Sequence, residues 1–176
     1  MRLTESHTGF SVIRPAHGLE LYRIVRDEIH RCGTDADLNH IDTSRVQSLY
    51  TMFMDESGFN GDVSLWDVSR VFCFDECFFM CCKFNCDLSG WDVSKGESFS
   101  KMFWGCKSFN QDLSKWRIKD DGFTNMYGMM HDCPAKKPQV LIDRENGIHT
   151  FTASSSSLEN HFPILPKSKG IRFLTR

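Results

Sequence analysis

The sequence predicts an α/β repeat solenoid, a stack of short parallel strands and short helices with a helical cap at its N-terminal end. A motif of the form Phe-Asn-x-Asp-x-Ser-x-Trp begins at Phe59, Phe84 and Phe109 and so returns every 25 residues. An amphipathic stretch precedes these copies, at residues 18–32. Self-similarity at a fixed period of this length is typical of repeats in which each unit buries its apolar face against its neighbours.

Each unit has two halves with different hydrophobic periodicity. In residues 62–68 the apolar side chains alternate with polar ones between turn residues, which favours a short strand. In residues 46–53 and 99–106 they recur at spacings of three and four without proline, which favours about two to three helical turns. Stacking such units predicts one parallel sheet with helices on its outer face.

The array has three well-formed units and degenerate ends. Residues 37–46 match residues 62–71 as a weaker copy, with Ile41 in the tryptophan position. After the third unit we expect a shortened copy, which aligns only if one residue is deleted between residues 117 and 122. In that alignment Phe123, Met126 and Tyr127 match Phe99, Met102 and Phe103.

The chain is therefore divided into an arm and capping helix at residues 1–36, the repeats at 37–138, and an accessory segment at 139–176. The apolar stripe of residues 18–32 ends at Gly33, a residue that commonly follows a helix. We expect this helix to cover the open end of the array, and a partner-binding amphipathic helix is the alternative. Alternating apolar residues around Glu145-Asn146-Gly147 predict a β-hairpin over 139–153, followed by a basic tail.

The repeat motif, with its Trp-Asp-Val-Ser core at residues 66–69 and 91–94, resembles the BspA-type leucine-rich-repeat surface-protein family. The similarity covers about residues 19–138 and includes the methionine-phenylalanine pair at 102–103. It implies a leucine-rich-repeat-like solenoid that binds a partner, in many relatives on a bacterial surface. It does not name a ligand.

Composition favours one domain with a sizeable core, since 40% of the 176 residues are hydrophobic. The formal net charge of −2 hides an acidic body and a basic tail. A charge excess of this size is more often solvation than a nucleic-acid or membrane site, so we expect no nucleic-acid partner. No secretory signal and no apolar run long enough to span a bilayer are visible, which predicts a cytoplasmic protein if the chain is complete.

The eight cysteines favour buried free thiols. Five of them lie within residues 73–86, but without the paired C-x₂-C spacing of structural zinc sites. Cys77 stands in a methionine position and Cys81 aligns with Cys106, as expected of small apolar side chains in the stack. Disulfides and zinc stay open as alternatives.

Aspartates recur at two positions of the repeat, for example at Asp62, Asp87 and Asp112. Stacking would bring these carboxylates to about 4.8 Å, the spacing of neighbouring strands, where unscreened charges repel. Either a row of calcium ions or bonds from backbone N–H groups within each turn would relieve this repulsion. Aspartate commonly makes such turns, so the second explanation is favoured.

No catalytic motif was found, and none of the seven histidines recurs with the period. We therefore expect a non-catalytic protein-binding module without cofactors or metal. An intracellular effector or inhibitor that uses the same surface is one alternative, and an enzyme with its site in residues 139–176 is another.

Positions that vary between units mark where a protein partner would bind, because the stack does not dictate them. Leu65 and Lys115 share one such position, and Gln111 occupies another. Alternation with inward residues predicts that they face solvent. Arg117 and Lys119 add a basic cluster that could meet an acidic partner.

Overall fold

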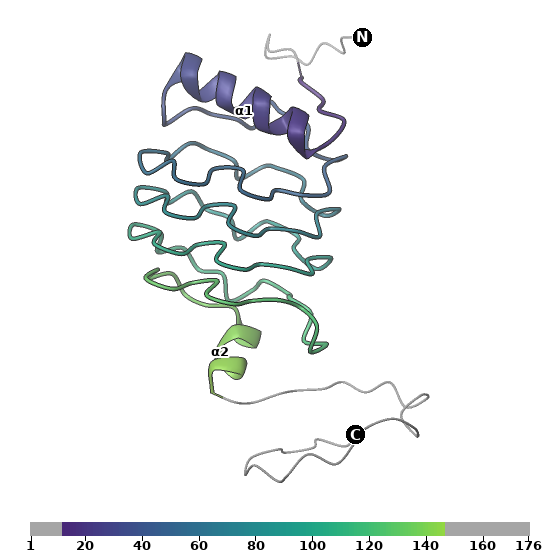
Figure 1. Ribbon diagram of the computed structural model, residues 1–176, viewed down its shortest axis with the longest axis vertical. Coiled ribbons are helices and arrows are strands. Elements are labelled where there is room, and N and C mark those ends of the chain that lie inside the picture. Colours follow the sequence, from purple (N-terminus) through teal and green to yellow (C-terminus); the bar gives the residue numbers. More distant parts are fainter. Residues whose placement is uncertain (1–11, 147–176) are drawn as a thin grey trace.

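The computed structural model describes residues 12–146. Two helices, α1 (Gly18–Cys32) and α2 (Gln139–Glu145), stand at the two ends of the described chain. Between them the chain forms a column of stacked irregular coils, each returning beneath the one before it (Figure 1). The division at residues 36 and 138 stays a prediction.

Helix α1 confirms the helix predicted over residues 18–32. The side chain of His17 accepts the backbone N–H of Glu20 at 3.3 Å, and Gly33 ends the helix with φ 89°. Leu21 and Val25 are fully buried, so the apolar stripe packs inward against the coils. The helix lies across the first coil of the column (Figure 1).

The predicted α/β solenoid is wrong. Residues 12–146 contain no strand and no sheet, and neither half of any repeat forms a helix. Neighbouring coils meet instead through single parallel bridges, such as those that join Ser48 to Cys73 and Cys73 to Ser98. A leucine-rich-repeat-like sheet with outer helices is therefore absent from these residues.

Left-handed backbone conformations explain why the apolar spacing of residues 46–53 does not make a helix. Thr51 has φ 51° and Asp55 has φ 62°, and a helix requires negative φ throughout. The same two positions of the later units are also left-handed. They are occupied by Glu76, Lys101 and Gly128, and by Met80, Gly105 and Asp132.

Backbone N–H groups in this half of the coil alternate between two kinds of partner. Those of Met52 and Met54 donate to the carbonyl three residues earlier, which makes tight turns. Those of Leu49, Thr51 and Phe53 donate to the following coil at 2.8–3.0 Å. The pattern satisfies the buried backbone without a helix or a continuous strand.

The last coil has a longer period than the alignment predicted. Ser98 is bridged to Asn125, and Phe99 N–H donates to Asn125 O at 2.7 Å. The unit therefore gains two residues instead of losing one. Met126 takes the buried position expected for Phe123, whose side chain is 91% exposed.

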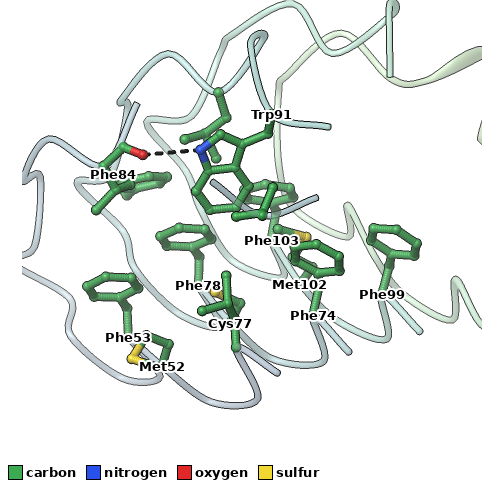
Figure 2. Close-up of a cluster of buried hydrophobic side chains, with 14 of the residues drawn as sticks. Met52, Phe53, Phe74, Cys77, Phe78, Phe84, Trp91, Phe99, Met102 and Phe103 are labelled. Carbon is green, nitrogen blue, oxygen red and sulfur yellow. Dashed lines mark hydrogen bonds between the residues drawn. The ribbon is translucent and has the colours of Figure 1, made fainter. Parts of the chain in front are cut away.

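The core consists of parallel rows of aromatic rings that run along the column (Figure 2). Phe53, Phe78 and Phe103 stack at centroid distances of 5.1 and 5.5 Å. Trp66, Trp91 and Trp116 line a second buried row, and the rings of Trp91 and Trp116 are parallel at 6.4 Å. Each indole N–H donates to a carbonyl of the preceding coil, as Trp91 does to Val63 at 3.1 Å (Figure 2).

The hairpin predicted over residues 139–153 is wrong in its first half, where α2 forms instead. Leu141 is buried, and Arg144 donates to Thr124 O at 2.7 Å while its guanidinium pairs with Asp120. These contacts outweigh the local alternation of apolar residues. The rest of that prediction and the basic tail lie outside the described residues.

Candidate functional site

The predicted partner-binding residues fall into an exposed group and one half-buried residue. Leu65 is 78% exposed, and Lys115, Arg117 and Lys119 are also exposed. Gln111 is half-buried, and its Nε2 donates to the backbone oxygen and to Oδ1 of the asparagine at position 85, both at 2.9 Å. Gln111 therefore serves the contact between coils.

The structure places the three cations in the same coil, at alternate positions. Trp116 and Ile118 separate them and are buried, so the cations of residues 115–119 share the outward side. Leu65 occupies the same repeat position as Lys115 two coils away. One outward stripe thus carries Leu65 and the basic cluster.

A second surface, which was not predicted from the sequence, lies on the half of each coil that contains the two residues with left-handed backbone conformation. We call it the aromatic face and define it by Tyr50, Phe79, Trp104 and Tyr127. Tyr50 is 58% exposed and Tyr127 69% exposed, and they occupy equivalent positions three coils apart. At about 4.8 Å for each coil, they lie roughly 14 Å apart along the column.

The backbone of each coil produces this face. Thr51 lies in the left-handed region next to Tyr50, so the chain turns there while Leu49 and Phe53 point into the core. The side chains on either side of the turn consequently face outward. Met54, Phe79, Trp104 and His131 form the outward row of one position.

Neighbouring coils support the half-buried rings of this row. The Trp104 ring lies 4.0 Å from that of His131, and a Cβ added to Gly128 would come within 2.6 Å of the indole. Lys101 Nζ lies 5.9 Å from the Phe79 ring centroid. The rings are therefore held against backbone and cation, with one surface left to solvent.

Turn formation explains the aspartate rows. Asp62 Oδ1 accepts the backbone N–H of Ser64 at 2.9 Å, and Asp87 does the same with Ser89 at 2.9 Å. Accepting this bond holds the pKa of Asp87 below its usual range, because the bond favours the charged carboxylate. The predicted aspartate turns are thus confirmed.

Neither metal nor disulfide chemistry is visible in residues 12–146. No group of three His, Cys, Asp or Glu side chains there could hold a metal ion, and all eight cysteines are unpaired. The Sγ atoms of Cys81 and Cys106 lie 2.9 Å from the carbonyls of Phe53 and Phe78. Burial raises the pKa of both thiols, so they remain protonated at neutral pH.

A hollow of about 570 Å³ lies at the C-terminal end of the column. Residues 126–132 of the last coil form one wall, and residues of α2 form the other. Lys137 pairs with Glu145 at 2.7 Å there. None of the helices in the described residues is long and apolar enough to cross a membrane.

Comparison with known proteins gives one match. A family described as "Mycoplasma protein of unknown function, DUF285" matches residues 25–142, about two thirds of the chain. No curated protein and no solved structure matches. The matched family is related to BspA-like surface repeat proteins, but the match does not establish the BspA-type family itself. This chain belongs to the DUF285 family.

Proposed function

We propose that this chain is a non-catalytic repeat module that binds a protein partner through the aromatic face. The observation that carries the proposal is the pair of largely exposed tyrosines, Tyr50 and Tyr127, on either side of the supported rings of Phe79 and Trp104. Tyrosine and tryptophan are enriched where binding energy concentrates in protein interfaces. Exposed apolar groups of this kind are typical of interaction sites.

Rigidity makes this face suitable for binding. Each coil is tied to the next by four backbone hydrogen bonds of 2.7–3.0 Å in the half that carries the rings. Tyrosine side chains also have few rotatable bonds, so little conformational entropy is lost when a partner covers them. The roughly 14 Å between Tyr50 and Tyr127 fits within one interface of standard size.

The stripe of Leu65, Lys115, Arg117 and Lys119 is the second candidate surface of the same function. Its basic cluster suits an acidic partner and would act on the association rate more than on affinity. The motif similarity to BspA-type repeats favours a partner on another cell's surface. An intracellular effector that uses the aromatic face would have the same binding properties.

The test is a quantitative affinity capture with three forms of the full-length protein. The first is the parent, the second carries Tyr50→Ala and Tyr127→Ala, and the third carries Leu65→Ser and Lys115→Ala as a matched surface control. Because all four side chains are exposed, circular dichroism should show an unchanged fold.

We expect a partner that the parent and the control capture and that the tyrosine variant loses. Its affinity for the tyrosine variant should fall by roughly 30-fold or more, the effect of losing one interface hot spot. If the control loses the partner and the tyrosine variant keeps it, the binding surface is the stripe of Leu65. Equal capture by all three forms would refute both surfaces.

A further inference from the structure

The last coil ends the column with four backbone N–H groups that have no partner among the described residues. In each of the three preceding interfaces, four N–H groups donate to the next coil; at the last of them the donors are Phe99, Lys101, Phe103 and Gly105. Within residues 12–146 no coil follows the last one, so its equivalent groups lack this partner. They belong to Met126, Gly128, Met130 and Asp132, and we call them the donor edge.

All four residues of the donor edge line the hollow of about 570 Å³. The opposite wall is α2, which contributes Leu141, Arg144 and Glu145. The hollow is therefore a groove between an unpaired backbone edge and a helix. Unpaired backbone donors are costly unless water or a partner satisfies them.

The charges around the groove are already paired within the chain. Lys137 pairs with Glu145 at 2.7 Å, and Arg144 pairs with Asp120 at 3.0 Å. The groove thus offers backbone donors without a net charge of its own, and Met130 and Leu141 are buried in its walls. A neutral ligand that carries a row of acceptors fits it best.

An extended polypeptide supplies such a row. The donors belong to alternate residues, so they are spread along a line and cannot converge on one small anion. The N-terminal end of the column shows that a short segment can add to a coil: Ile13 bridges Ile41, and Asp42 N–H donates to Ile13 O at 2.8 Å. Addition of a peptide to an unpaired edge is a recurring mode of recognition.

A second copy of this chain cannot fill the edge by head-to-tail stacking. That arrangement would need the free carbonyls of the first coil, and α1 covers them. A Cβ added to Gly18 of α1 would lie 2.7 Å from Ser48 O, so the helix sits directly on that end. Two donor edges placed face to face would lack acceptors.

We propose that the groove between the donor edge and α2 binds an extended segment of a partner protein. The carbonyls of the segment accept from the donor edge as a following coil would. Tyr127 lines the groove as well as the aromatic face, but Tyr50, Phe79 and Trp104 do not, so a change at Tyr50 tests the aromatic face separately from the groove. Either site can fail without the other.

The probe is a displayed library of peptides of about eight residues, enough to offer four alternate carbonyls, selected on the full-length protein. The groove-filling variant is Glu145→Trp, which places an indole in the groove from an exposed position. The matched control is Glu145→Gln, which also removes the ion pair with Lys137 but adds no volume. Tyr50→Ala reports on the aromatic face.

We expect selected peptides to bind the parent, Glu145→Gln and Tyr50→Ala with equal affinity. Their affinity for Glu145→Trp should be lower by about tenfold or more. Amide exchange of Met126, Gly128 and Met130 should slow by about tenfold or more when peptide is added. Three results would overturn the proposal: no selected peptide, peptides that bind Glu145→Trp unchanged, or donor-edge amides already protected in the free protein. The last would mean that the chain covers its own edge.

Discussion

Replacing Trp91 by alanine should destabilise the fold strongly, because this ring touches several rows of the core at once. The side chain is 4% exposed, and its ring lies 6.2–6.4 Å from the rings of Phe74, Phe78 and Trp116. Truncation of a buried tryptophan to alanine costs about 3–5 kcal/mol through lost burial and the cavity left behind. Loss of the bond to Val63 O adds about 1 kcal/mol.

Losing the indole hydrogen bond costs little because Val63 O also accepts the backbone N–H of Trp66 at 3.2 Å and so keeps a partner. We therefore expect the free energy of unfolding to fall by about 4–6 kcal/mol. Urea denaturation followed by far-UV circular dichroism measures this, since indole fluorescence changes with the mutation itself. Trp91→Phe is the matched control and should cost about 1–3 kcal/mol, because it keeps an aromatic ring and loses mainly the hydrogen bond. A Trp91→Ala protein within about 1 kcal/mol of the parent would refute the packing argument.

Three further predictions concern backbone space, thiols and pH. Gly96→Ala should lower the free energy of unfolding by about 1–3 kcal/mol in urea denaturation, because the new Cβ would lie 2.1 Å from the Phe99 ring. Gly90 has open space around it, so Gly90→Ala should leave the free energy of unfolding nearly unchanged. Titration of the denatured protein without reductant should find close to eight free thiols. In the folded protein Cys106 should react slowly, because burial raises its pKa. A thiol count near zero after denaturation would contradict this prediction. The folded-state pKa of Asp87 lies below its unfolded value, so its contribution to stability is present above about pH 4 and disappears as pH falls through the folded pKa. Asp87→Asn should remove this share of the pH dependence of stability, as measured by urea titrations at different pH. An unchanged pH dependence would refute this prediction.

The repeat spacing predicted the stack and its buried rows, whereas the local conformation of each coil was not predictable from hydrophobic periodicity. Apolar spacings of three and four occur in a helix, but they also occur in a chain that turns at alternating left-handed residues. The sequence carried one signal of these turns, since Gly105 and Gly128 fall on the two left-handed positions. Thr51 and Glu76 at the equivalent positions of other units hid it.

The candidate site was predicted in part. Alternation with buried residues correctly placed Leu65 and Lys115 outside, but Gln111 bonds across the coils, and no pattern within one unit reports such a contact. The aromatic face was missed because Tyr50 and Trp104 resemble core aromatic residues in composition. Only the turn between positions 50 and 54 separates them from the core, and it depends on backbone conformation.

Hydrogen bonding, not similarity of side chains, fixes the register of the last coil. Aligning Phe123 with Phe99 preserves an aromatic residue in a core row, which is why a deletion looked favourable. The structure instead places Asn125 opposite Ser98, and this register buries Met126, Met129 and Met130 while it completes four bonds to the preceding coil.

Moving the last coil back by three residues would place Phe123, Met126 and Tyr127 at the core positions that Met126, Met129 and Met130 occupy in the structure. Apolar burial alone does not choose between the two registers, because each of them buries three large side chains. The longer unit accommodates the two extra residues in the turn around Asp121, whose Oδ1 accepts the N–H groups of Phe123 and Thr124 at 2.9 and 3.0 Å. Because this register assigns the donor edge to Met126, Gly128, Met130 and Asp132, amide exchange at these residues tests the alignment as well as the groove.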